Sequence, residues 1–137
     1  MRVLIIGGTR YLGREVVARL VARGDAVTVA NRAATPGELP ASVQRVQADL
    51  SEPGSLERAL GALTFDAAIN MIASSAASAH EALVAVADSI GHYVQCGSTG
   101  VYAPLQHVPA DESHPDQLEI VYPEAGKAVR VTTSPER

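Results

Sequence analysis

This sequence is poor in the residues that most often indicate disulfide, metal or nucleic-acid chemistry. Its 137 residues include one cysteine, Cys96, one lysine, Lys127, one phenylalanine and no tryptophan. A single cysteine excludes an internal disulfide and gives no cluster of metal ligands, so we expect no metal site. The arginines are scattered and the formal net charge is -4, which argues against binding to nucleic acid.

Long apolar runs are also missing. No stretch reaches the length that spans a membrane, and the apolar start of the chain is too short for a secretory signal. We therefore expect a cytoplasmic protein without membrane contacts. The apolar fraction of 47% and the charged fraction of 19% are those of an ordinary globular domain. The sequence leaves open whether the protein forms a homo-oligomer.

What the sequence does have is an alternation of short apolar runs and helical patterns. Strands are expected at 2–7, 26–31, 43–48, 65–73 and 92–97, and helices at 12–24, 56–63 and 79–90. This alternation predicts an α/β fold, a doubly wound parallel sheet of the Rossmann type. Its expected strand order is 3-2-1-4-5, with a ligand crevice at the carboxyl ends of the first and fourth strands.

The stretch LIIGGTRYLG, residues 4–13, joins the first expected strand to the first expected helix. Gly7 and Gly8 can adopt backbone angles that other residues avoid, and they let the backbone approach a ligand. Gly13 would let the helix pack closely on the sheet. The amides and the dipole at the start of that helix favour a bound anion, which indicates a phosphate site. A plain tight turn is the alternative.

The end of the second expected strand indicates which dinucleotide such a site would take. Dinucleotide sites usually place a carboxylate there, but this chain has Asn31 followed by Arg32. A guanidinium pairs with phosphate in a forked geometry, so Arg32 and Arg10 favour NADP over NAD, although NAD remains open. The alternative is that both arginines are solvated. Asp49 would lie near the adenine or would cap the next helical segment.

Four motifs together resemble a known family. GGTRYLG, ADL at 48–50, INMIAS at 69–74 and CGSTGVYAP at 96–104 have the order and spacing of the extended short-chain dehydrogenases/reductases, the NAD-dependent epimerases/dehydratases. The GGTR form is similar to an atypical branch that includes bacterial epimerase-like proteins and chloroplast RNA-binding relatives. The resemblance covers residues 1 to about 115 and implies a dinucleotide and a small-molecule substrate as partners.

The resemblance also assigns roles by position. The glycine loop would bind the pyrophosphate, the ADL segment would lie near the adenine, and the backbone after the fourth strand would pass beside the adenosine and ribose. The family motif has a glycine where this chain has an arginine in the loop. The expected cofactor-binding residues are Gly7, Thr9, Arg10, Tyr11, Leu12, Gly13, Asn31, Arg32, Asp49, Leu50, Met71, Ile72 and Ala73.

In the resembled family, a serine polarises the substrate carbonyl, and a tyrosine and a lysine four residues apart handle the proton. Ser98 matches the serine, and Tyr122 and Lys127 are the nearest match to the pair. These two are five residues apart, which on a helix turns their side chains about 140° from each other. Pro123 and Gly126 also interrupt a helix. Tyr122 as a buried apolar anchor is the competing interpretation.

The resemblance divides the chain in two. We expect an NAD(P)-binding domain at 1–115 and, at 116–137, an irregular tail or the start of a substrate region that is truncated here. The first hypothesis is the dinucleotide-binding domain of an epimerase, dehydratase or reductase acting on a nucleotide sugar or a similar carbonyl or hydroxyl substrate, with the isolated chain inactive. The alternatives are a dinucleotide-binding sensor or interaction module without turnover and, less favoured, an RNA-binding protein.

Overall fold

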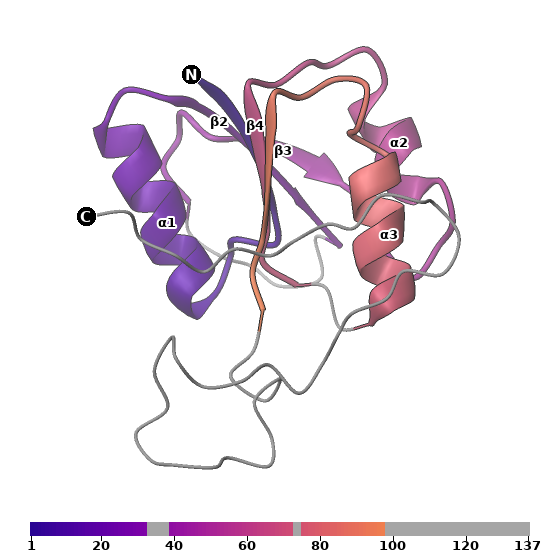
Figure 1. The fold of residues 1–137 in the computed structure, drawn as a ribbon. Helices are drawn as coiled ribbons and strands as arrows, with labels where there is room; N and C mark the ends of the chain where they lie inside the picture. Colours follow the sequence, from indigo (N-terminus) through magenta and orange to yellow (C-terminus); the bar gives the residue numbers. More distant parts are fainter. Residues whose placement is uncertain (33–38, 73–74, 98–137) are drawn as a thin grey trace, which may run out of the picture. The chain divides into compact units, whose positions relative to one another are not determined.

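The fold is built on a sheet of five parallel strands with helices packed on both faces (Figure 1). The computed structural model describes residues 1–32, 39–72 and 75–97, which except for Gly97 lie in one compact unit, Met1–Cys96. The elements are β1 (Arg2–Ile6), α1 (Tyr11–Ala22), β2 (Ala26–Asn31), β3 (Gln44–Gln47), α2 (Ser55–Leu60), β4 (Ala67–Asn70), α3 (Ala76–Val84) and β5 (His92–Gln95). The strand order is β3-β2-β1-β4-β5, which confirms the predicted sheet and its order.

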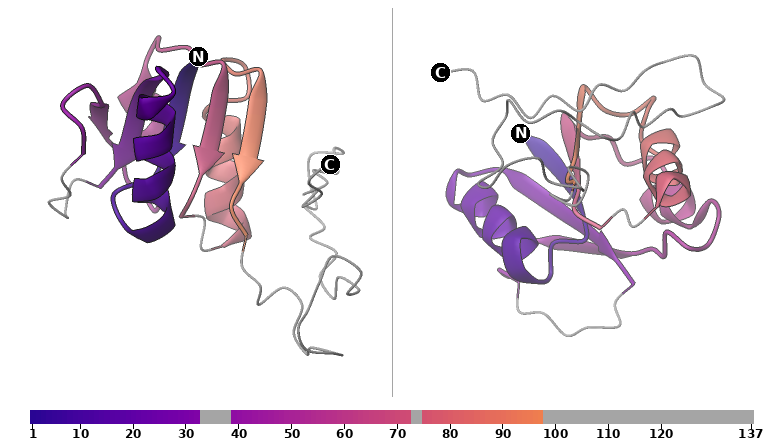
Figure 2. Two further views of the ribbon diagram at one scale, coloured as in Figure 1. Left: turned by 90° about the vertical axis from the view of Figure 1, so that its left-hand side faces the viewer. Right: turned by 60° about the horizontal axis from the view of Figure 1, so that its bottom comes forward.

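The central strand β1 is apolar because both of its faces are buried. Val3 and Ile5 pack with Val17 of α1 on one face, whereas Leu4 and Ile6 pack with apolar side chains of α2 and α3 on the other. Figure 2 shows α1 on one side of the sheet and α2 and α3 on the opposite side. Such two-sided burial is what the continuous apolar run at the start of the chain predicts.

Helix α1 stops where a glycine allows the chain to reverse. Gly24 has a φ of 89°, a left-handed conformation that glycine adopts without strain. Its amide donates to the carbonyl of Val21, and the amide of Asp25 donates to that of Leu20. This pair of hydrogen bonds is a common helix ending. At 12 residues, α1 is the longest helix in the described part of the chain, where no helix is long and apolar enough to cross a membrane.

Helix α3 is shorter than its apolar pattern predicts. It ends at Val84, although the expected helix reached residue 90. Beyond it, the amides of Val86, Ala87 and Ser89 donate to carbonyls three residues earlier, so the chain forms successive tight turns. The hydroxyl of Ser89 also donates to the carbonyl of Val86. Val86 is still buried in the core, so the pattern predicted burial correctly but not helix.

Candidate functional site

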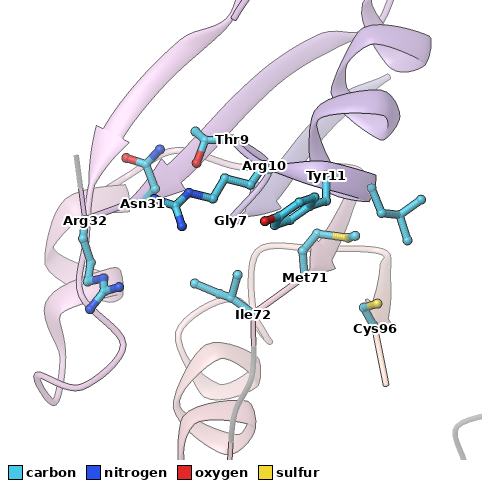
Figure 3. A pocket seen from close by; sticks show the side chains of 12 residues that line it. Gly7, Thr9, Arg10, Tyr11, Asn31, Arg32, Met71, Ile72 and Cys96 are labelled. Carbon is cyan, nitrogen blue, oxygen red and sulfur yellow. The ribbon is translucent and has the colours of Figure 1, made fainter. Parts of the chain in front are cut away.

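A cavity of about 440 Å³ lies at the carboxyl ends of four strands (Figure 3). Gly7 directly follows β1, Asn31 is the last residue of β2, and Met71 and Cys96 directly follow β4 and β5. This is the edge where the parallel sheet predicts a ligand crevice. The residues that line it are Gly7, Gly8, Thr9, Arg10, Tyr11, Leu12, Gly13, Asn31, Arg32, Met71, Ile72 and Cys96. All except Gly8 and Cys96 are residues that the sequence analysis places at a dinucleotide site.

The three glycines of the loop are each needed for a different contact inside the protein. Gly7 and Gly8 have φ angles of 100° and 85°, as their predicted role in the turn requires. A Cβ added to Gly7 would lie 2.7 Å from the side chain of Ile72, and one added to Gly8 would lie 2.7 Å from that of Ile5. The space beside these two glycines is therefore filled by protein. Gly13 packs against the backbone of Gly8, where we expected contact with the sheet.

The first turn of α1 leaves its backbone amides available to an anion. Arg10 is the N-cap residue, and its side chain makes no capping hydrogen bond. The first bonded amide is that of Arg14, which donates to the carbonyl of Arg10 over 3.3 Å. The amides of Tyr11, Leu12 and Gly13 precede it, so they have no acceptor within the helix. These residues line the cavity, and the positive end of the helix dipole lies there.

The end of β2 gives the cavity a cationic margin. Arg32 is exposed and lines both this cavity and a second one of about 600 Å³. No carboxylate is among the residues that line the first cavity. The second cavity is lined by Arg32, Asp49, Leu50, Ser51, Pro53, Ile72, Ser75, Ala77, Ser78 and Glu81. Because Arg32 and Ile72 belong to both, the two cavities adjoin, and together they hold every expected cofactor residue of the described part of the chain.

Asp49 stabilises a turn and also lines the second cavity. Its Oδ1 accepts hydrogen bonds from the amide (2.9 Å) and the hydroxyl (2.7 Å) of Ser51. These bonds lower the pKa of the Asp49 carboxyl, and the charge of Arg32 lowers the pKa further. Of the two roles left open for Asp49, capping of the next helix is wrong, because α2 has Gly54 at its N-cap and no side-chain cap. The carboxylate belongs to the turn that precedes that helix.

Asn70 is a structural residue of the site that the sequence analysis missed. Its side chain is fully buried at the end of β4. Its Oδ1 accepts from the amide of Ile72 (3.2 Å), and its Nδ2 donates to the hydroxyl of Tyr93 on β5 (3.1 Å). Its carbonyl accepts from the amide of Cys96 (2.8 Å). Asn70 thus connects the two chain segments, after β4 and after β5, that form one wall of the first cavity. In the sequence, only the presence of an amide side chain inside an apolar strand could have indicated this role.

The remaining expected site residues lie outside the described part of the chain. They are Ala73 after β4 and the three residues matched to catalytic positions, Ser98, Tyr122 and Lys127. Among the expected site residues, the described part of the chain therefore contains only positions expected to bind the cofactor.

A glycine turn between the first strand and the first helix of a doubly wound parallel sheet, with uncapped helix amides at a cavity, defines a Rossmann-type nucleotide-binding fold. The chain belongs to the NAD-dependent epimerase/dehydratase family, whose model matches residues 3–126. Membership confirms the family resemblance.

Similar proteins agree with this assignment. The chain is 33% identical over 113 residues to 2'-dehydrokanamycin reductase of Streptomyces kanamyceticus, and the match covers 82% of this chain but 32% of that protein. UDP-galactose 4-epimerase has a TM-score of 0.71 at 18% identity, and the Bordetella bronchiseptica enzyme WbmG in complex with NAD has 0.70 at 20%. Each structural match covers 85% of this chain, and 45% and 43% of those chains. At such identities the two structures show the fold alone, and the chain spans under half the length of each relative.

Proposed function

We propose that this chain binds NADP(H) and forms the cofactor-binding part of an oxidoreductase or epimerase of its family. The observation that supports this best is the first cavity, where a glycine turn, uncapped first-turn amides and two arginines meet at the strand ends. The amides of Leu12 and Gly13 would bind the pyrophosphate. Asp49 and Leu50 in the second cavity would face the adenine. The bound dinucleotide would supply or accept a hydride.

The preference for NADP over NAD rests on the end of β2. A carboxylate at this place would accept hydrogen bonds from the ribose hydroxyls and would repel a 2'-phosphate. Here Asn31 occupies it, and the exposed guanidinium of Arg32 lies beside both cavities. A planar guanidinium can bind a phosphate through two hydrogen bonds.

For the reaction we propose a carbonyl or hydroxyl group on a sugar-like substrate. The support is the family itself and the reductase relative, whose name describes action on a dehydrokanamycin. Ser98 would polarise the carbonyl from within a nucleotide-binding domain that ends near residue 115, and Tyr122 and Lys127, which follow that domain, would handle the proton. A dinucleotide-binding module without turnover is the second candidate, because Tyr122 and Lys127 are five residues apart where a helical pair needs four.

Titration calorimetry with NADPH and NADH at one salt concentration tests the cofactor proposal. Wild type should bind NADPH more tightly than NADH. Arg32→Asp removes a charge-assisted contact and adds a repulsion, so NADPH affinity should fall by about 1–3 kcal/mol, or roughly 5- to 150-fold. NADH affinity should not fall.

Arg14→Asp is the matched control, because Arg14 is exposed on α1, carries the same charge and lines neither cavity. Equal wild-type affinities for the two cofactors would contradict the preference, and absence of binding would contradict the cofactor proposal. In a longer protein that also carries a substrate region, turnover of sugar ketones with NADPH that is lost in both Ser98→Ala and Tyr122→Phe would favour the enzyme over the module.

A further inference from the structure

We infer that the side chain of Tyr11 recognises the nicotinamide half of the dinucleotide and so makes the site selective for a whole dinucleotide over its adenosine half. This inference rests on the proposed function and adds a role for one side chain in that site. Tyr11 has two properties that the protein's own packing does not explain.

The first property is exposure. Tyr11 is 91% exposed, more than any other large apolar residue in the described part of the chain. Its hydroxyl makes no hydrogen bond to a described residue. Leu12 and Ile72 line the same cavity and are 60% and 46% exposed. The cavity thus has an apolar margin that the free chain leaves in water, and such margins mark binding surfaces.

The second property is backbone strain. Tyr11 has a φ of 43°, and it is the one residue other than glycine with a positive φ in the described part of the chain. A bulky side chain is disfavoured in this conformation, whereas glycine or asparagine adopts it readily. Strain of this kind is concentrated at functional sites. The ring lies between Gly7 and Met71 in Figure 3, and all three residues line the first cavity.

The position of Tyr11 along the cavity tells which part of a ligand it would meet. Asn31 and Arg32 end β2, on one side of β1, whereas Met71 and Cys96 follow β4 and β5, on the other side. Strands lie about 4.8 Å apart, so β2 and β5 are separated by roughly 14 Å. In Figure 3, Arg32 and Asn31 lie at one end of the cavity, and Tyr11 lies with Met71 toward Cys96 at the other.

The two ends therefore differ in chemistry. The end at Arg32 is cationic and suits a phosphate, while the end at Tyr11 and Met71 is aromatic and apolar and suits a flat uncharged or cationic ring. An extended ligand with a phosphorylated ribose at one end and nicotinamide at the other matches both. A phenol ring beside nicotinamide contributes by stacking, which needs the ring but not its hydroxyl.

The test compares two ligands, NADPH and its adenosine half, 2',5'-ADP, by titration calorimetry. Tyr11→Asn keeps a residue that tolerates the positive φ and removes the ring. It should weaken NADPH binding about three- to tenfold and leave 2',5'-ADP affinity within about twofold of wild type. Tyr11→Phe keeps the ring and removes only the hydroxyl, so it should match wild type for both ligands. Tyr11→Gly, which also tolerates the positive φ, repeats the ring removal if the asparagine variant folds poorly. Val84→Asn is the control, because Val84 is also an exposed apolar helical residue and lines neither cavity.

Unchanged NADPH affinity in Tyr11→Asn would overturn the inference while leaving the proposed function intact. Equal loss for both ligands would also overturn it, because the residue would then act on the phosphate-binding loop. A loss in Tyr11→Phe as large as that in Tyr11→Asn would overturn the stacking role. Failure of wild type to bind either ligand would overturn the proposed function, and this inference with it.

Discussion

Replacing Gly13 by alanine measures how tightly the glycine turn and α1 are packed. Gly13 is buried in the first turn of α1. An added Cβ would lie 2.6 Å from Cα of Gly8 and 3.0 Å from its nitrogen. Both are backbone atoms of a residue with a φ of 85°, so they cannot rotate away as a side chain would. The helix or the turn has to shift to admit the methyl group.

Two opposing effects set the size of the change. In an exposed helix, alanine is more favourable than glycine by about 1 kcal/mol. Overpacking a well-fitted interior costs roughly 1–3 kcal/mol, and a contact between two backbone segments lies at the upper end. We therefore expect Gly13→Ala to lower the free energy of unfolding by about 1–2 kcal/mol. With a urea dependence of about 1–3 kcal/mol per molar, the midpoint should fall by roughly 0.3–2 M.

Urea unfolding followed by circular dichroism gives the stability, and NADPH titration of the folded variant gives the effect on the site. Gly24→Ala is the control at the other end of α1, because an added Cβ there meets nothing within 4 Å and only the positive φ is unfavourable. It should lose stability but keep NADPH affinity, whereas Gly13→Ala should lose both. A Gly13→Ala variant more stable than wild type would refute the reasoning, since helix propensity alone would then decide.

Three further substitutions test other parts of the described structure. Asn70→Leu removes the acceptor of the Ile72 amide and the donor to the Tyr93 hydroxyl, so unfolding should become easier by about 1–3 kcal/mol, and an unchanged melting temperature would contradict this. The pKa of Asp25 is lowered, chiefly by its hydrogen bond from the N-terminal ammonium. Because the folded pKa lies below the unfolded one, this stabilisation is complete above the unfolded pKa of about 3.9 and disappears as the pH falls through the folded value. Asp25→Asn should flatten the loss of stability in acid, and an unchanged acid slope would rule out this contribution. Arg10→Ser should make α1 more stable than Arg10→Ala by about 1 kcal/mol, because serine caps a first-turn amide. It should also bind NADPH more weakly than Arg10→Ala, and equal affinities would show that these amides do not hold the phosphate.

The sheet could be predicted because a buried parallel strand is apolar throughout, and that signal is local in the sequence. The run at 26–31 became β2 without change, and the run at 2–7 became β1 with one residue fewer. The end of α3 could not be predicted in this way. Val86 and Ile90 continue the helical spacing and do pack in or against the core, but the chain reaches them through tight turns. Hydrophobic periodicity reports burial, and the backbone hydrogen bonds decide the conformation.

The site residues, too, could be predicted from the sequence only where they are close together in it. The glycine loop is contiguous in the sequence, so its residues could be placed together before the structure was known. The contact between Asn70 and Tyr93 depends on the pairing of β4 with β5, in which Ala68 is opposite Tyr93 and Asn70 opposite Gln95. One wall of the second cavity is formed by α3 and its N-cap, through Ser75, Ser78 and Glu81. Which face of α3 is turned toward the cavity cannot be read from a single sequence.

The first turn of α1 carries two unfavourable features that packing does not explain. The missing side-chain cap at Arg10 costs about 1 kcal/mol relative to serine or aspartate, and the positive φ of Tyr11 costs on the order of 1–3 kcal/mol. Both features lie at the cavity that we assign to the cofactor. A phosphate bound by the first-turn amides would occupy the place of a cap, and a flat ring beside Tyr11 would cover the exposed phenol. A capping side chain and a bound phosphate would use the same first-turn amides. A residue at position 10 that stabilised the free helix by capping it would therefore weaken phosphate binding.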